Sequence, residues 1–409
     1  MAITSNIANL ATVTRASKAW DPGAWDFVSG SAVGPLVEYA SGVARTPPSG
    51  LLVEESGTNL IRNPRFEGAT LGVIGSGGVL PTYMSHAGMT GLEITAIGTE
   101  GGWDYMEIEA AAWTPSGNVT LIFETGISGT IDDDTSYTTA AGVKLVTGST
   151  ANMDTLSVKQ SWYSGVPGTG YLGVDASDDF KATIDASHRR FFASGVATTT
   201  AISVRNSLTI TWSSGALTFK IRVYAPQAEN KAYPTSPILP DVSSPAETTR
   251  AADDISIPNG DWSNDDGAGS IYAAFTFNQV GQAATHPRVV SYSSDNSNRV
   301  EVLRSTTSSL QALSTDGGVA QSALDSGVTP SAATQYKLAV AWDTNDMALS
   351  VTGGTQATDT SCTIGFGAAL LRLGQRSGGG DRVPSMYLAE LRYFPRRLTN
   401  TELESLVGN

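Results

Sequence analysis

The chain has 409 residues, of which 40% are hydrophobic and only 16% are charged, and its formal net charge is −14. One hydrophobic core stops growing at roughly 250–300 residues, so two or three domains are expected. The low charge content and the 43 glycines are typical of short strands joined by tight turns and exclude a helical bundle. The acidic balance, without a run of Lys or Arg, excludes nucleic acid and anionic membranes as expected partners.

The single cysteine and the start of the chain bear on where the protein folds. Cys362 has no second cysteine to pair with, and it follows a strand pattern that predicts a buried, small apolar side chain. The first residues lack a basic segment followed by an apolar one, which a signal peptide needs. No apolar run approaches the ~18 residues of a spanning helix. We therefore expect folding in a bacterial cytoplasm without a signal peptide and without membrane insertion.

Residues 1–60 predict an extended arm rather than a domain. In "ATVTRASKAWDPGAWDFVSG" short apolar spots alternate with Asp-Pro-Gly and Ser-Gly breaks. So small a segment cannot offset the entropy of its own ordering, so we expect it to dock on another protein or a neighbouring protomer. The residues expected to dock are Arg15, Trp20, Trp25 and Phe27.

Two strand-rich regions follow, separated by a proline-rich stretch. Residues 61–235 contain alternating segments such as "WDYMEIEAAAW" and "NSLTITWSSG", with turn signals at the roughly 8–12-residue spacing of β-sandwiches. Residues 236–252 predict a stiff linker because their prolines resist both helix and central strand. Residues 253–409 return to strands. The predicted fold class is all-β, with two jelly-roll sandwiches.

Two local signals near the C-terminus are specific. In "YKLAVAWDTNDMALSV" two alternating runs flank Asp343 to Asp346, which predicts a hairpin. Thr399 and Glu402 form a capping box before an apolar pattern, which predicts one short helix at the end of the chain.

Three motifs stand out along the chain: "VTRASKAW" followed by "GLLVEESGTNLIRN", then "YAPQAENKAYPTSPILP" with "TTRAADD", and finally "LAELRYFPRRLTNTELESL". They resemble segments of virion surface proteins of tailed bacteriophages and phage-like particles, of the tail-fibre or head-spike type. The last motif is similar to the closing strand and helix of concanavalin-A-like (laminin-G-like) domains. The motifs cover about 70 residues in matching order and spacing. Gly57 departs from the pattern, since a larger, often charged residue is usual there.

The resemblance implies a particle-surface protein whose arm anchors to capsid or tail proteins. Its sandwiches, one similar to carbohydrate-binding modules, would then face host cell-surface polysaccharide. A homo-oligomer is implied, a trimer in a fibre or a pentamer at a capsid vertex. The resemblance carries over no catalytic residue and leaves head or tail position open.

The sharpest enzymatic motif is "WDYMEIE". Glu107 and Glu109 share one face of the predicted strand, while Asp104 points to the other. Sandwich glycosidases pair carboxylates on one strand, but in the order Glu-x-Asp-x-x-Glu, which this motif does not follow. We therefore expect solvent-facing carboxylates, with Met106 and Ile108 in the core, and no enzyme. A polysaccharide hydrolase remains the alternative, as does a purely structural spacer.

Sugar binding needs aromatic faces that stack on pyranose C–H groups and polar side chains that bond hydroxyls. In the first sandwich the candidates are Trp103, Asp104, Tyr105, Trp113, Trp162 and Tyr163. In the second, Asp381 and Arg382 lie in a glycine-rich loop. The alternative is that the aromatic residues belong to the core.

Metal binding has weak candidates only. Asp132, Asp133 and Asp134 offer the oxygen ligands that calcium prefers, although acidic loop tips are usually solvated turns. The three histidines lie about 100 residues apart and lack zinc-ligand spacing. We expect no cofactor, and calcium as the metal if one binds.

Overall fold

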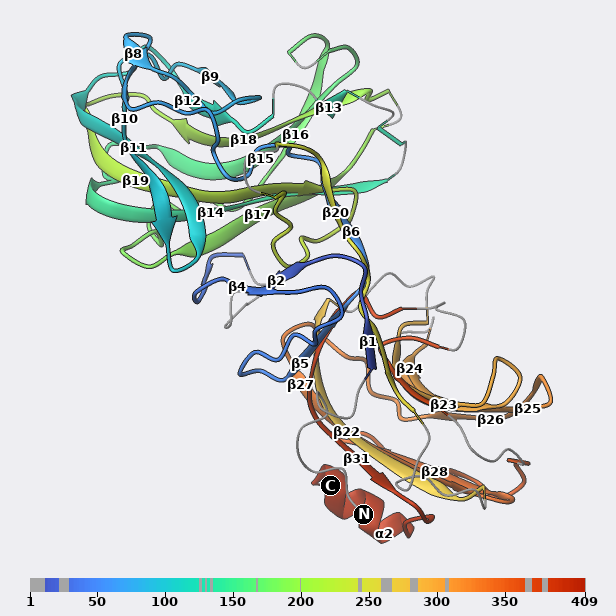
Figure 1. The fold of residues 1–409 in the computed structure, drawn as a ribbon. Coiled ribbons are helices and arrows are strands. Elements are labelled where there is room, and N and C mark those ends of the chain that lie inside the picture. Colours follow the sequence, from blue (N-terminus) through green and yellow to red (C-terminus); the bar gives the residue numbers. More distant parts are fainter. Residues whose placement is uncertain are drawn as a thin grey trace. The chain divides into compact units, whose positions relative to one another are not determined.

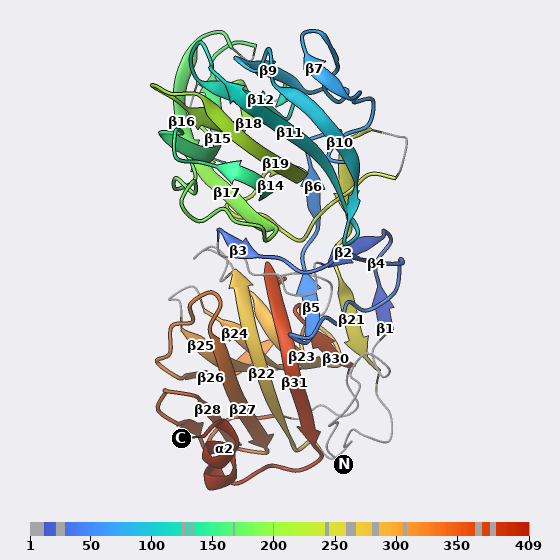
Figure 2. The ribbon, with the colours of Figure 1, turned by 90° about the vertical axis from the view of Figure 1, so that its left-hand side faces the viewer.

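The structure is a computed structural model that describes residues 12–21, 29–124, 127–128, 131–132, 135–166, 168–198, 200–241, 245–258, 267–279, 286–305, 309–364, 370–376 and 382–408. The chain forms two compact units. The central unit consists of Ala19–Glu38 and Gly57–Arg250. The C-terminal unit consists of Met1–Lys18, Tyr39–Ser56 and Ala251–Asn409. The predicted all-β class is confirmed (Figures 1 and 2).

The central unit is a sandwich of two antiparallel-rich sheets around one apolar core. The eight-stranded sheet has the order β3 (Ser31–Ala32), β17 (Arg189–Val196), β14 (Ser136–Ser149), β19 (Leu217–Glu229), β11 (Trp103–Trp113), β10 (Glu93–Glu100), β7 (Gly72–Ile74), β8 (Gly77–Gly78). The facing sheet has the order β16 (Tyr171–Ala176), β15 (Thr155–Tyr163), β18 (Ser203–Thr211), β12 (Val119–Ile122), β9 (Ser85–Ala87), with β13 (Ile127–Ser128) also paired to β18.

The C-terminal unit is also a sandwich, and its core lies between a seven-stranded and a six-stranded sheet. The first has the order β1 (Thr12–Thr14), β21 (Asp254–Ile257), β30 (Leu370–Leu373), β23 (Arg288–Ser293), β24 (Arg299–Arg304), β25 (Leu310–Asp316), β26 (Val319–Asp325). The second has the order β29 (Ala357–Asp359), β28 (Asp346–Val351), β27 (Gln335–Asp343), β22 (Gly269–Gln279), β31 (Ser385–Phe394), β5 (Leu51–Glu54).

Both local predictions near the C-terminus are confirmed. Asp343 pairs with Asp346 across the β27–β28 turn, and Asn345 takes a positive φ of 58°. Helix α2 (Asn400–Val407) begins after Thr399, whose side chain accepts a hydrogen bond from the backbone N–H of Glu402. The helix packs its apolar side on β27 and β28, at the end of the chain drawn in dark red (Figure 2). Among the described residues no helix is long and apolar enough to cross a membrane.

The first 60 residues add strands to both sandwiches. The chain passes from one unit to the other after residues 18, 38, 56 and 250. In the C-terminal unit β1 pairs with β21 and β5 pairs with β31, and in the central unit β3 pairs with β17. There are also two separate two-stranded sheets: β2 (Ala19–Asp21) pairs with β4 (Val37–Tyr39), and β6 (Gly57–Asn59) pairs with β20 (Thr248–Arg250).

The described part of the arm therefore pairs with strands of this chain's own units, whereas the sequence predicted docking on another protein or a neighbouring protomer. The stretch "LLVE" of β5 is fully buried, as expected for a core strand. The stretch predicted as a stiff linker, residues 236–252, also packs in part against this chain instead of standing apart. Its Ser236, Ile238 and Leu239 are exposed by 3% at most, because they pack into the central unit.

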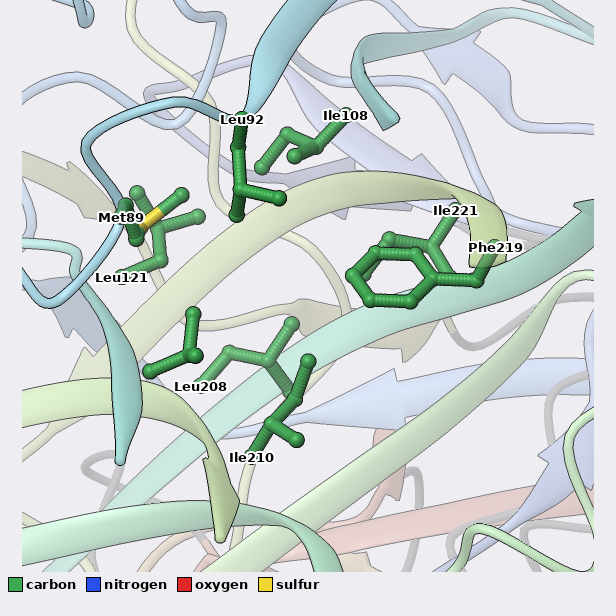
Figure 3. A pocket seen from close by; sticks show the side chains of 9 residues that line it. Met89, Leu92, Ile108, Leu121, Leu208, Ile210, Phe219 and Ile221 are labelled. Atoms are coloured by element: carbon green, nitrogen blue, oxygen red, sulfur yellow. The ribbon is translucent and has the colours of Figure 1, made fainter. Parts of the chain in front are cut away.

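A small apolar pocket of about 20 Å³ lies inside the central sandwich (Figure 3). Its walls come from both sheets, with Ile108, Phe219 and Ile221 on one side and Leu208 and Ile210 on the other. The volume would admit about one water molecule, but the apolar walls give that water no hydrogen-bond partner. The pocket is an imperfection of core packing and holds no sugar site.

Candidate ligand-binding face of the central unit

Side chains of β15 and β18 alternate between the apolar core and the opposite face of the sheet. Leu156, Val158 and Trp162 of β15 and Val204 and Leu208 of β18 belong to the apolar core. Because successive strand residues point to opposite faces, the odd-numbered positions point outward. We call these outward residues, together with Tyr171 of the neighbouring strand β16, the Arg205 face: Ser157, Lys159, Ser161, Tyr163, Tyr171, Ser203, Arg205, Ser207 and Thr209.

One end of the Arg205 face carries two tyrosines and the arginine. Tyr171 lies opposite Tyr163 in the β15–β16 pairing, and the two rings meet edge to face with centroids 5.9 Å apart. The guanidinium carbon of Arg205 lies 5.0 Å from the centroid of the Tyr163 ring, within reach of a cation–π interaction. Tyr163 is almost buried, whereas Tyr171 is 60% exposed. Tyr171 thus presents an exposed aromatic ring whose position is held by its contact with the buried ring of Tyr163.

A glycine-rich loop closes over this end. Ser164 and Gly170 pair through a backbone hydrogen bond of 2.9 Å, and the Ser203 hydroxyl donates to the carbonyl of Gly165 at 2.6 Å. Gly168 has a φ of +99°, and a Cβ there would come within 2.6 Å of Nη2 of Arg205. Only glycine therefore lets the loop approach the guanidinium this closely.

Exposed apolar side chains occur near Tyr171 in the chain and next to the paired strands. Of the large hydrophobic residues that are exposed in the described part of the chain, several lie in the loop before β16, in β16 itself and next to β18: Val166, Leu172, Val174 and Ile202. Such a cluster beside polar groups is typical of an interaction site.

The rest of the face is rich in hydroxyls. Ser157, Ser207 and Thr209 are buried in the strands, while Ser161 and Lys159 are half-buried. Burial lowers the pKa of the Lys159 ammonium. No carboxylate occupies an outward position of β12, β15, β16 or β18 within the described residues. Asp175 of β16 faces inward, where it accepts a hydrogen bond of 2.7 Å from Nε1 of Trp162.

The outer surface of the eight-stranded sheet is different, because its charges pair with one another. Glu107 accepts a hydrogen bond of 2.8 Å from Nε of Arg222, and Glu100 is bound by Lys144 at 2.7 Å. Burial alone would raise the pKa of Glu107, but the hydrogen bonds from Arg222 and Thr95 lower it. A catalytic acid needs the opposite shift. Glu107 and Glu109 share a face as predicted, and the Lys220 ammonium bridges them.

The predicted aromatic sugar ligands fall in different places. Trp103 and Trp162 are exposed by 3% and 2%, so neither offers a face to solvent. Trp113 packs partly against the core. Tyr105 lies on the outer surface of the eight-stranded sheet, 4.1 Å below the guanidinium of Arg222. Tyr163 alone among these rings belongs to the Arg205 face.

The other predicted polar residues either bind groups of this chain or lie outside the described residues. Asp104 binds Arg65 at 2.5 Å, and Arg382 donates to the carbonyl of Asp253 at 2.8 Å. Asp132 is exposed, and within the described residues no three acidic, histidine or cysteine side chains gather as a metal site would require. Asp133, Asp134 and Asp381 lie outside the described residues, as do Trp25 and Phe27.

Arg15 and Trp20, predicted to dock on another protein, are buried in this chain, with 2% and 6% exposure. Arg15 binds Asp253 through Nη1 at 2.8 Å and the carbonyl of Ala40 through Nη2 at 2.8 Å. The ring of Trp20 lies 5.9 Å from the guanidinium carbon of Arg65. Their roles are therefore structural within the described residues.

The first two motifs of the resemblance also supply buried polar networks. In the central unit Asn59 accepts from the backbone of Ile61 and Ala228, at 3.0 Å each, and donates to the carbonyls of Pro226 and Ile238. All four hydrogen-bonding positions of its amide are thus used.

No family model matches the chain, and no curated protein does. Solved structures resemble parts of it. The carbohydrate-binding module of the Ruminococcus gnavus IT-sialidase bound to α2,6-sialyllactose is 15% identical, covering 35% of this chain and 84% of its own, with a TM-score of 0.29. Domain 4 of the Geobacillus stearothermophilus arabinanase AbnA, with arabinotriose, is 14% identical, covering 44% and 84%, with a TM-score of 0.31. Domains LG4-5 of the mouse laminin α1 chain are 10% identical, covering 75% and 93%, with a TM-score of 0.25. These likenesses assign no residue of this chain a role.

Sequence patterns alone did not point to Tyr171, Lys159 or Arg205 as ligand-binding residues. A signal was present in "TLSVKQSWY", whose alternation places Lys159 and Tyr163 on the outward face. The neighbour relation between Lys159 and Arg205 could not be read from sequence, because it depends on the pairing of β15 with β18.

Proposed function

We propose that the protein is a non-catalytic adhesin that binds polysaccharide through the Arg205 face. The supporting observation is Tyr171, which is 60% exposed and held edge to face against Tyr163, whose ring also lies under Arg205, on a face that carries the half-buried hydroxyl of Ser161. An aromatic ring stacks on the C–H surface of a sugar, and nearby hydroxyl and guanidinium groups bond its hydroxyls. A glycosidase needs two carboxyl groups, and the described outward strand positions of this face have none.

A glycan array tests this proposal. Wild-type protein should bind a set of bacterial polysaccharides, and Tyr171→Ala should weaken that binding about tenfold, because one stacking platform is lost. The matched control is Tyr83→Ala, because Tyr83 is a half-buried tyrosine elsewhere in the same unit, with its ring centroid 3.6 Å from the guanidinium carbon of Arg62. Equal binding by Tyr171→Ala and wild type would contradict the proposal. A change in oligomeric state without a change in binding would instead assign the patch to self-association.

We further propose that the protein is displayed on a phage or phage-like particle, bound to capsid or tail proteins as a homo-oligomer. The three sequence motifs support this proposal. Mass spectrometry and immunogold microscopy of purified particles test it. We expect the chain on the particle surface, and its absence from purified particles would refute the assignment.

A further inference from the structure

Lys159 and Arg205 of the central unit have no carboxylate partner among the described residues, and Lys181 of the same unit binds the backbone carbonyls of Met153 and Asp154. Neither side chain contacts a carboxylate among the described residues, although the chain carries 39 Asp and Glu against 25 Lys and Arg. Six other cations of this unit each bind a carboxylate: Arg62, Arg65, Lys144, Arg189, Lys220 and Arg222. No described carboxylate of this chain therefore supplies the counter-charge of Lys159 and Arg205.

The two side chains are neighbours on one surface. In the β15–β18 register Lys159 lies opposite Ser207, and Ser161 lies opposite Arg205. Lys159 and Arg205 therefore occupy diagonal positions on adjacent strands, where Cα atoms are about 7–8 Å apart and long side chains can reach a shared group. Tyr163, which lies opposite Ser203, is the second diagonal neighbour of Arg205 on β15, and it lies opposite Tyr171 on its other side.

The surroundings of both cations favour the binding of an anion. Arg205 is supported by the ring of Tyr163, and the backbone of Gly168 lies against its guanidinium. A guanidinium held in place loses little freedom when it bonds a carboxylate or phosphate. The ammonium of Lys159 is partly desolvated, so an anion would supply the counter-charge that its surroundings lack.

We propose that the Arg205 face recognises an acidic polysaccharide, in which a carboxylate or phosphate group binds Lys159 and Arg205 while an adjacent sugar ring stacks on Tyr171. This inference rests on the proposed sugar-binding function and narrows its ligand to an anionic class. With a net charge of −14 the protein as a whole repels such polymers, so binding depends on this local pair of cations and weakens with salt.

Binding to matched polymers tests the inference. Polygalacturonate and its fully methyl-esterified form share a backbone and differ in charge, and poly(glycerol phosphate) supplies the phosphate arm. We expect wild type to bind at least one charged polymer about tenfold more tightly than the neutral one. Preference for polygalacturonate would indicate a carboxylate ligand, and preference for poly(glycerol phosphate) a phosphate ligand.

The variants are Lys159→Gln, Arg205→Gln and Arg205→Lys. The two Gln variants should lose about tenfold in affinity for the charged polymer, while Arg205→Lys keeps part of it. Lys337→Gln makes the same charge change at an exposed site of the C-terminal unit and should stay near wild type. If Arg205→Gln does not fold, the affinity of Lys159→Gln decides the test, because Lys159 is only half-buried.

The outcomes separate the two proposals. If wild type binds array glycans but prefers no charged polymer, or if both Gln variants bind as wild type does, the anionic assignment is wrong while sugar binding stands. If wild type binds neither array glycans nor any of these polymers, the proposed function itself fails.

Discussion

His188 illustrates how one residue of the central unit is fixed by aromatic neighbours. Its ring stacks on Tyr224, with centroids 4.0 Å apart, and meets the edge of Trp103 at 4.6 Å. Gly142 is required beside it, because a Cβ at that position would collide with Nε2 of the ring. The predicted sugar ligand Trp103 is thus part of a buried stack.

The environment of His188 makes a prediction about pH. Burial, followed by the charge of Arg190, lowers the pKa of His188 to about 3 from an ordinary value of 6.5. Between pH 6.5 and pH 3 the His188 ring is protonated in the unfolded chain but neutral in the folded one. The contribution of this group to the free energy of unfolding is therefore complete above pH 6.5 and is lost as the pH falls toward 3. The slope from this group is at most about 1.4 kcal/mol per pH unit.

We expect His188→Gln to flatten this dependence, although it lowers stability at neutral pH by losing the stack. Tryptophan fluorescence during denaturant unfolding measures it, since Trp103 and Trp162 report on the central unit. His86→Gln, in the same unit, controls for the loss of a histidine. An unchanged pH profile in His188→Gln would show that the ring is solvated.

At the scale of elements, four buried charges join separate segments of the C-terminal unit. Asp253, just before β21, accepts from Arg15 after β1 and from Nη2 of Arg45, and its Oδ2 also accepts from the backbone N–H of Glu54 in β5 at 3.0 Å. Arg45 in turn binds the Glu54 side chain at 2.6 Å. Burial alone would lower the pKa of Arg45, but the two carboxylates raise it. Two positive and two negative charges balance, as charges this deeply buried require.

Removing one charge should therefore be costly. We expect Asp253→Asn to destabilise the C-terminal unit by about 3–5 kcal/mol, because two buried guanidinium groups lose their shared carboxylate. Calorimetry of the full chain should show that unit's transition moved to lower temperature while the central unit's stays in place. Asp316→Asn, a half-buried aspartate of the same unit, is the matched control. A loss no larger than the control's would mean that water reaches the cluster.

At the scale of the whole molecule, the described segments of the first 56 residues are part of both folds. The C-terminal unit takes β1 and β5 from them, and Leu51, Leu52 and Val53 are exposed by no more than 3%. Each such buried apolar side chain contributes about 1.5–3 kcal/mol. Without β5, strand β31 would also expose an open edge.

We therefore expect a chain of residues 57–409 to lose the cooperative unfolding transition of the C-terminal unit and to become protease-sensitive there. Calorimetry and limited proteolysis, compared with the full chain, measure this. Two intact transitions in the shortened chain would show that the second sandwich stands alone.

The sequence alone determined the all-β class, the β27–β28 hairpin, the capped final helix and the inward side of β11, with Met106 and Ile108 in the core. These features depend on alternation and on residues close in the chain, which a single sequence records. The Arg205 face and the Arg15–Asp253 ion pair, 238 residues apart, depend on strand register and long-range pairing. Only the tertiary structure decided them, because the free energy of a pairing between distant segments is set by the whole core. The same reason moved Trp103 and Trp162 from the expected binding surface into the interior.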